Sequence, residues 1–172
     1  MGDTLLINRV AESDLQTIVL EDLVDASSII AFDLQAFLFQ GLILKEKDFR
    51  EALKIYDWAA LEGKHLAVYC STDAIIPMWA YMLIASYARP YTDSIHFGEI
   101  PQVYEKLLWD QISNKDWSYL KEKRVVIKGC SDKDLPASAF LGISSALQPI
   151  VQSMMYGEPC STVPIFKRPR KI

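Results

Sequence analysis

The amino-acid sequence predicts an α/β protein, specifically a three-layer sandwich with a mainly parallel sheet and an internal repeat. Segments of strand character alternate with segments of helical character, an order typical of parallel sheets whose faces are covered by helices. When the chain is shifted by 59 residues, positions 57–99 align with 116–158 without a gap, and 13 of these 43 positions are identical. Ordinary composition would give roughly two or three identities. The two copies are expected to span about 46–99 and 105–158.

The first copy reads as helix, strand, helix, strand. Apolar residues recur at helical spacing over 46–56, and the apolar run 65–69 is typical of a buried strand. Pro77 predicts the start of a second helix, which continues to about Ala88, because the fixed φ of proline suits a first helical turn. A strand at 94–97 then ends at Gly98.

The second copy repeats this order. Its expected elements are helices at about 101–112 and 136–147 and strands at 124–128 and 151–156. Two segments before the repeat also have strand character, namely 28–33 and, as an edge strand, 17–20. The sequence thus predicts a sheet of about five strands.

Length and composition predict one domain over 1–172 that ends in a basic tail at 165–172. The chain is 51% hydrophobic and carries a net charge of -4, which excludes disorder and a broad nucleic-acid-binding surface. Because the tail charges stand beside prolines, they are expected to form a solvated terminus. The sequence has neither a signal-peptide pattern nor a membrane-spanning apolar run, so we expect a cytoplasmic protein outside the membrane.

All three cysteines stand in Cys-Ser dipeptides near the ends of predicted strands: Cys70, Cys130 and Cys160. A reducing compartment would keep them as thiols. The carboxyl ends of parallel strands line the crevice in which open α/β sheets bind ligands, and a following helix N-terminus stabilises a thiolate. The sequence therefore places the chemistry of this protein at the cysteine loops.

A metal ion would explain why carboxylates accompany these thiols, because a carboxylate alone disfavours a neighbouring thiolate. If the three preceding strands are neighbours, three thiolates converge and leave one coordination position open, which suits an iron-sulfur cluster or zinc. The predicted metal ligands are Cys70, Cys130, Cys160, Asp73 and Asp132. The hydroxyl groups expected to contact the cofactor are those of Ser71, Thr72, Ser131 and Ser161.

Two alternatives remain open on the residues alone. Free cysteines are often buried and inert, which fits a non-catalytic module that binds a protein partner through its sheet edge or helices. The other alternative is a thiol redox or sulfur-transfer enzyme with Cys70 as the catalytic nucleophile. The two histidines, His65 and His96, are expected to be structural. In the helix that begins at Pro77, four side chains are expected to pack in the core: Trp79, Tyr81, Met82 and Tyr87.

Four segments resemble the Bacteroidetes domain-of-unknown-function family DUF2480: FQGLILKEKDFR at 39–50, CSTDAIIP at 70–77, KGCSD at 128–132 and GEPCSTVP at 157–164. The resemblance covers nearly the whole chain. It implies a cytoplasmic bacterial protein without an assigned activity. Through an association with iron-sulfur assembly genes, it also implies iron-sulfur assembly proteins as partners of a metal-binding or cluster-binding protein.

Overall fold

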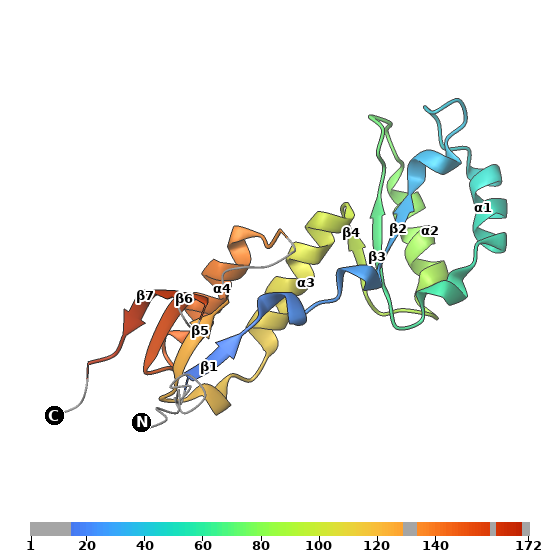
Figure 1. Cartoon of the computed structure of the whole chain (residues 1–172). Helices are drawn as coiled ribbons and strands as arrows, with labels where there is room; N and C mark the ends of the chain where they lie inside the picture. The colour runs from blue at the N-terminus through green and yellow to red at the C-terminus, as the bar shows by residue number, and fades with distance from the viewer. Residues whose placement is uncertain (1–14, 129–133, 159–160, 170–172) are drawn as a thin grey trace, which may run out of the picture. The chain divides into compact units, whose positions relative to one another are not determined.

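The computed structural model describes residues 15–128, 134–158 and 161–169 (Figure 1). The chain divides into two compact units. We call Asp25–Lys106 the continuous unit, and Met1–Val24 together with Leu107–Ile172 the split unit. The fold is mixed α/β, and its strands form two sheets that are mainly parallel.

The continuous unit holds a three-stranded parallel sheet in the order β2-β3-β4. Its strands and α-helices are β2 (Ile29–Asp33), α1 (Glu46–Ile55), β3 (His65–Tyr69), α2 (Met78–Ala88) and β4 (Ile95–Phe97). Its short 3-10 helices are η2 (Ala26–Ser28), η3 (Leu34–Phe37) and η4 (Trp58–Leu61). Helix α3 (Ile100–Asn114) begins in this unit and ends in the split unit.

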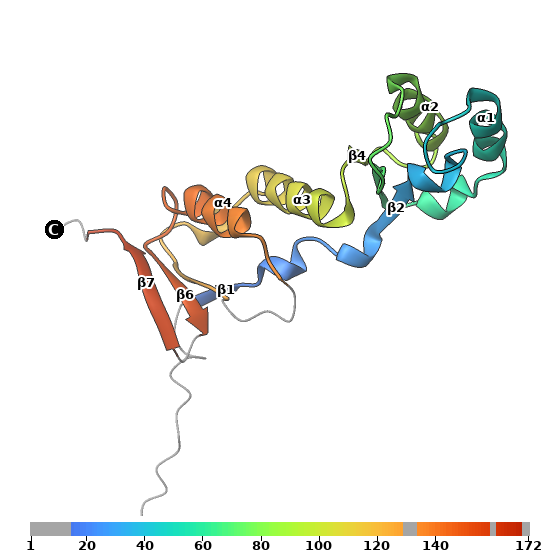
Figure 2. The same cartoon turned by 90° about the horizontal axis from the view of Figure 1, so that it is seen from above.

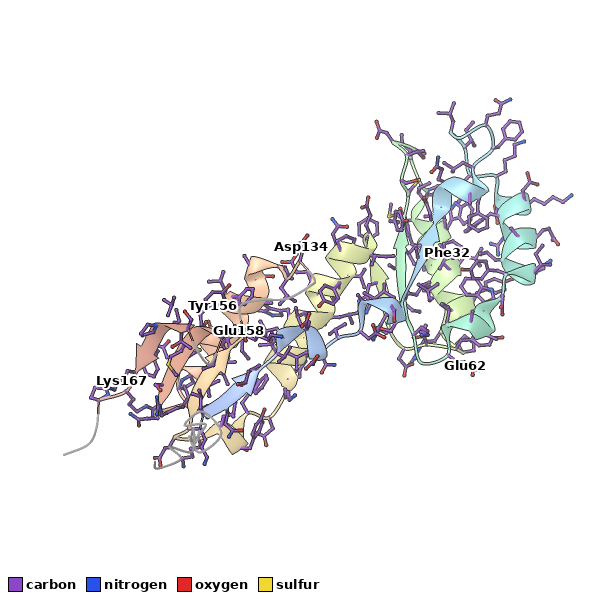
Figure 3. All side chains as sticks on the ribbon, in the orientation of Figure 1. Phe32, Glu62, Asp134, Tyr156, Glu158 and Lys167 are labelled. Atoms are coloured by element: carbon purple, nitrogen blue, oxygen red, sulfur yellow. The ribbon has the colours of Figure 1, made fainter. Side chains whose placement is uncertain are left out.

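One face of this sheet packs against both α1 and α2. Phe49 of α1 and Ile84 of α2 belong to one core cluster with Phe32 and Leu66 of the sheet. The ring of Phe32 stacks on those of Phe37 and Trp58, and Figure 3 shows Phe32 among the side chains that fill this core. The core is therefore a single layer of side chains between the sheet and two helices.

The order of the strands explains why α1 and α2 share a face. Connections between parallel strands are right-handed in nearly all proteins. Because β2, β3 and β4 follow one another across the sheet in chain order, two successive right-handed connections place both helices on the same side. The predicted three-layer arrangement is therefore not seen in this unit, and the described strands form two sheets where the sequence predicted one.

The split unit has a four-stranded sheet in the order β1-β5-β6-β7. The first three strands are parallel, and β7 runs antiparallel to β6. Its elements are β1 (Leu15–Ile18), η1 (Leu20–Asp22), η5 (Ser118–Leu120), β5 (Arg124–Ile127), α4 (Ala137–Leu147), β6 (Ser153–Glu158) and β7 (Ser161–Lys167). Phe140 of α4 contacts Tyr156 of β6, and Figure 2 shows α4 on one side of these strands.

Contacts in the two units recur at the 59-residue spacing seen in the sequence. The indole of Trp58 donates to the carbonyl of Leu53 at 2.8 Å, and that of Trp117 donates to Ile112 at 2.9 Å. Gly98, which follows β4, and Gly157, the next-to-last residue of β6, have φ values of 125° and 126°. The predicted order of helices and strands is thus found in both units, while descent from one duplicated segment stays an interpretation.

Part of the predicted basic tail lies in a strand. Residues 161–167 form β7, whose pairing with β6 extends from Ser161 to Lys167. Pro164 is tolerated because β7 is an edge strand, where one backbone amide can remain without a sheet partner. Residues 165–167 of the expected tail thus belong to a strand whose Ile165 and Lys167 are exposed, and the solvated tail over 165–172 stays a prediction.

Candidate functional site

Cys70 directly follows β3 and lies at the carboxyl edge of the three-stranded sheet, near the end of β2. Its thiol is partly buried and packs against the core cluster, with Sγ 3.3 Å from Oγ1 of Thr72. Burial and, after it, the charge of the Cys70 thiolate raise the pKa of the Tyr81 phenol. A neutral phenol and a thiol are thus held near each other at the start of α2.

Ser71 is exposed and is held by hydrogen bonds within the protein. Its amide donates to Oδ1 of Asp33 at 3.0 Å, and its hydroxyl donates to Oδ2 at 2.5 Å. Burial raises the pKa of Asp33, but the hydrogen bonds from Ser71 and Gln35 outweigh burial and hold that pKa below its ordinary value. The side-chain amide of Gln35 also contacts the Ser71 hydroxyl. The Gln35 atom that faces this hydroxyl is Oε1. Since the hydroxyl has one proton, Ser71 can donate to Asp33 and accept from the Gln35 nitrogen only with the amide group turned end for end.

The other predicted site residues divide into two groups. Thr72 is partly buried beside Cys70, whereas Asp73 and Ser161 are exposed. Four of them lie outside the described residues: Cys130, Ser131, Asp132 and Cys160. Across the described part of the chain, no group of three or more His, Cys, Asp or Glu side chains is arranged to hold a metal ion.

Within the described residues, the two sheets lack the strand order that forms a ligand crevice in open α/β folds. In open α/β sheets the crevice forms where the strand order reverses. Neither β2-β3-β4 nor β1-β5-β6 reverses its order, and β3 belongs to a different sheet from β5 and β6. The predicted metal site required the strands before the three cysteines to be neighbours, and these strands are not all neighbours. The convergence of the three thiols stays a prediction.

A hydroxyl of the continuous unit joins its two histidines. Oγ of Ser94 lies 2.6 Å from Nδ1 of His65 and 2.7 Å from Nε2 of His96. Because the hydroxyl has one proton, at least one imidazole must donate its N-H to Oγ. Burial lowers the pKa of His65, so its neutral form is favoured. This arrangement agrees with the expectation that both histidines are structural.

Sequence reasoning missed a group of exposed apolar side chains in the continuous unit. We call Ile75, Met78, Met82 and Phe97 the apolar surface; their exposed fractions are 93%, 72%, 74% and 77%. The Phe97 ring packs edge-on against Tyr81, with centroids 5.7 Å apart, which connects β4 to α2. The expectation that Met82 packs in the core was wrong. The sequence did contain a signal for this exposed surface. Helix α2 has no charged residue, and a helix that is apolar all round exposes apolar side chains on whichever face is not buried.

The fold defines a mixed α/β protein built on two mainly parallel sheets. The chain belongs to the family described as "Protein of unknown function (DUF2480)", whose model matches residues 4–168. The search of curated proteins and the search of solved structures gave no match. None of the helices in the described ranges is both long enough and apolar enough to cross a membrane.

Proposed function

We propose that this protein is a non-catalytic interaction module that binds a protein partner through the apolar surface of α2 and β4. The observation that carries this proposal is the strong exposure of all four members of that surface. Apolar residues scattered singly are normal on proteins, whereas a group of them marks an interaction site. Methionine and phenylalanine are also well suited to contact surfaces, because they offer a large apolar area and methionine adapts its shape.

Charges beside the apolar surface indicate the chemistry of the partner. Asp73 is two residues before Ile75, and Glu99 is two residues after Phe97. Both carboxylates are exposed, and neither forms an ion pair with another described residue. We therefore assign the surface to an apolar helix of a partner protein that carries lysine or arginine beside its apolar face.

The state of Cys70 supports the interaction module over a thiol enzyme. Its thiol packs against the core cluster, as expected of a cysteine that acts as a small apolar residue. Ser71 is held by Asp33. A separate catalytic role for Cys70 stays a prediction, and it would require that the thiol alkylate faster than a model thiol.

A synthetic helical peptide can test the proposal directly. The probe has a leucine face flanked by lysines, and the matched peptide has glutamates in place of the lysines. Fluorescence anisotropy should give tighter binding of the lysine peptide. Met82→Glu should weaken that binding by at least about tenfold, since it places a charge in the centre of the contact.

Ile55→Glu is the matched control, because Ile55 is 87% exposed on α1 of the same unit. It should leave the affinity within about twofold of the parent. Equal losses in both variants, or equal binding of both peptides, would contradict the proposal. A concentration-dependent dimer that Met82→Glu abolishes in light scattering would identify a second copy of the chain as the occupant and would overturn the assignment to a partner helix.

The second candidate function is binding of a metal ion or iron-sulfur cluster, with iron-sulfur assembly proteins as partners. One observation favours it: Oε1 of Glu158 is buried and accepts no hydrogen bond from a described residue, two positions before Cys160 (Figure 3). A buried carboxylate oxygen of this kind suits a cation. Protein purified without oxygen should then contain iron and sulfide, or about one zinc per chain.

Single cysteine replacements separate this candidate from the interaction module. Serine at Cys70, Cys130 or Cys160 should remove most of the metal, because two thiolates leave it undercoordinated. Asp73→Asn should remove less of the metal than the cysteine replacements do, as expected for an outer or exchangeable ligand. Metal-free anaerobic protein, with all three variants as stable as the parent, would exclude the candidate.

A further inference from the structure

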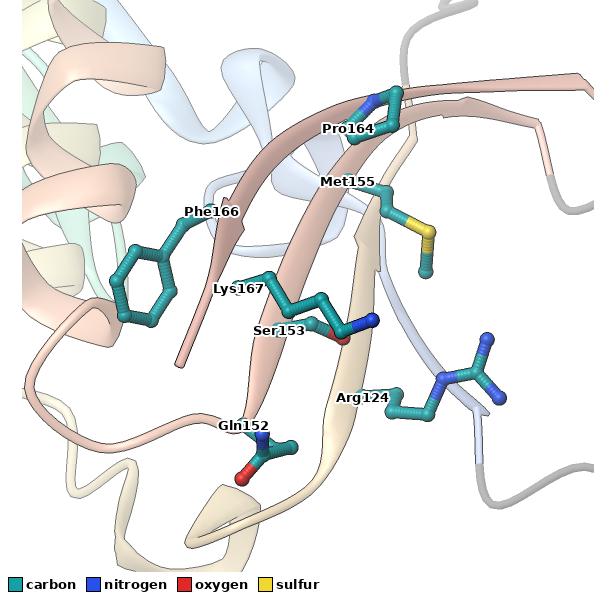
Figure 4. A pocket seen from close by; sticks show the side chains of 7 residues that line it. All are labelled: Arg124, Gln152, Ser153, Met155, Pro164, Phe166 and Lys167. Carbon is teal, nitrogen blue, oxygen red and sulfur yellow. The ribbon is translucent and has the colours of Figure 1, made fainter. Parts of the chain in front are cut away.

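A hollow on the split unit brings together side chains from three strands. It has a volume of about 540 Å³, and Figure 4 shows its seven lining residues. They are Arg124 from β5, Gln152, Ser153 and Met155 from β6 and the residue before it, and Pro164, Phe166 and Lys167 from β7. A volume of this size is in the range of small-molecule sites.

The polar lining of this hollow is cationic. The guanidinium of Arg124 and the ammonium of Lys167 extend to the same side of the sheet, and the Ser153 hydroxyl lies on the strand between them (Figure 4). None of the seven lining residues is acidic. Neither cation forms an ion pair with another residue in the described ranges. Two cations beside a hydroxyl donor, without a carboxylate to neutralise them, favour an anion.

The residues that follow Lys167 fix the end of β7. The amide of Arg168 donates to the carbonyl of Gln152 at 2.9 Å, and the Gln152 side chain donates back to the carbonyl of Arg168 at 2.8 Å. The Arg168 guanidinium donates to the carbonyls of Gln148 and Pro149 at 3.2 and 2.7 Å. The backbone on both sides of Lys167 is therefore already ordered. Binding of a ligand by the Lys167 side chain then costs no further backbone entropy at this position.

Met155 and Pro164 add an apolar part to the same hollow. We propose that the split unit binds a small organic phosphate, with its phosphate group between Arg124 and Lys167 and its apolar body on Met155 and Pro164. An arginine fork and a lysine point charge are the usual partners of phosphate oxygens. This site is separate from the apolar surface of α2 and β4 and does not depend on the function proposed for that surface.

Phenyl phosphate is the probe, and benzoate and benzyl alcohol are its matched carboxylate and neutral analogues. Isothermal titration should show phenyl phosphate binding tightest and benzyl alcohol not at all, and the affinity should fall as the salt concentration rises. Arg124→Met and Lys167→Met should each weaken binding by about tenfold or more. Arg124→Lys should restore part of the loss, because it retains the charge but not the fork.

Lys128→Met is the control, because Lys128 follows β5 on the same sheet, about 13 Å from Arg124 at the usual rise per strand residue. It should change the affinity by less than twofold. Amide chemical shifts on titration should move at 153–155 and 167 in the parent, so the site can be mapped even if a variant unfolds. An equal loss in Lys128→Met, shifts elsewhere only, or no binding of phenyl phosphate would overturn the proposal. Benzoate binding as tightly as phenyl phosphate would overturn the assignment to phosphate.

Discussion

The continuous and split units have the same frame of parallel strands but different chemistry on the sheet face away from the core helices. His65, Ser94 and His96 of one unit correspond at a spacing of 59 to Arg124, Ser153 and Met155 of the other. In the first unit the serine hydroxyl contacts both histidines, and in the second the serine lines the cationic hollow. The frame of parallel strands therefore depends on the side chains that face the helices, while the chemistry of the other face can change.

The sheet edges differ as well. In the split unit β6 is followed by β7, which pairs along it from Ser161 to Lys167. The corresponding strand of the continuous unit, β4, has three residues and ends its sheet. A short strand is one of the ways in which proteins protect an unpaired sheet edge. The extra strand β7 is what supplies Lys167, so the hollow has no counterpart in the continuous unit.

The largest expected effect comes from the paired tryptophans. Trp58→Ala and Trp117→Ala should each lower the free energy of unfolding by about 3–5 kcal/mol, because each leaves a cavity in a core. The loss should be greater for Trp58, whose ring meets those of Phe32, Tyr56 and Tyr87, whereas Trp117 meets Tyr119. Urea unfolding followed by circular dichroism measures both. A larger loss for Trp117 would contradict the view that aromatic packing is concentrated in the continuous unit.

Replacement of the paired glycines, Gly98 and Gly157, should have the next largest effect on stability. Both have a φ that an L side chain rarely adopts, so alanine should cost about 1–3 kcal/mol at either position. At Gly98 the new methyl would lie 2.8 Å from the flexible side chain of Gln102, but at Gly157 it would meet the backbone carbonyl of Ser161. Gly157→Ala should therefore be clearly the more destabilising, as read from thermal unfolding. Equal losses would show that the backbone at Ser161 can shift to accept a methyl group.

Removal of the paired serine hydroxyls should have unequal effects on stability. Ser94→Ala should cost about 1–2 kcal/mol, because it removes a shared partner from His65 and His96. Ser153 forms no side-chain hydrogen bond with a described residue, so Ser153→Ala should change the unfolding free energy by less than about 0.5 kcal/mol. Chemical denaturation of the two variants at neutral pH provides the test. If Ser153→Ala costs as much as Ser94→Ala, the serine of the split unit has a structural role.

The histidine pair should also give the continuous unit a pH dependence. Burial lowers the pKa of His65 in the folded protein, so the unfolded chain binds more protons below its own pKa of about 6.5. The contribution of His65 to stability is therefore present above that pH and is lost as the pH falls toward its folded pKa. Between neutral and mildly acidic pH, the melting temperature of His65→Gln should fall less than that of the parent protein. An unchanged profile would show that His65 does not contribute to it.

The smallest expected effect concerns the paired aspartates. Asp116 accepts from the amide and hydroxyl of Ser118, whereas the Asp57 side chain makes no cap, and Ala59 at the corresponding position has no hydroxyl to donate. The hydrogen bonds from Ser118 hold the pKa of Asp116 below its ordinary value, so its stabilising contribution should be lost in acid as the pH falls through that pKa. Asp116→Asn should lower the melting temperature slightly and Asp57→Asn should not. The reverse order would contradict this account of the cap.

Much of the secondary structure could be predicted because its signals are local. The helices begin where Pro77 and Pro136 predict, and the apolar run at His65–Tyr69 forms β3. Strand β7 was missed because a proline and several basic residues have the character of a solvated end, and only its pairing with β6 makes it a strand. Of the candidate site, the placement of Cys70 at a strand end was predictable, whereas its partners were not, since Asp33 reaches Ser71 from another strand.

The sequence by itself determined the order of helices and strands, the family and the 59-residue spacing, because periodicity, turn residues and identities are properties of the chain. The tertiary structure alone decided how these elements are shared between two sheets. Leu15 pairs with Arg124 although the whole continuous unit lies between them in sequence, and no local signal specifies such a partner. The face that carries the apolar surface and the face that carries the cationic hollow each follow from how the strands pair within their own sheet. Strand order and right-handed connections together determine which side of a sheet its helices cover and which side chains remain exposed.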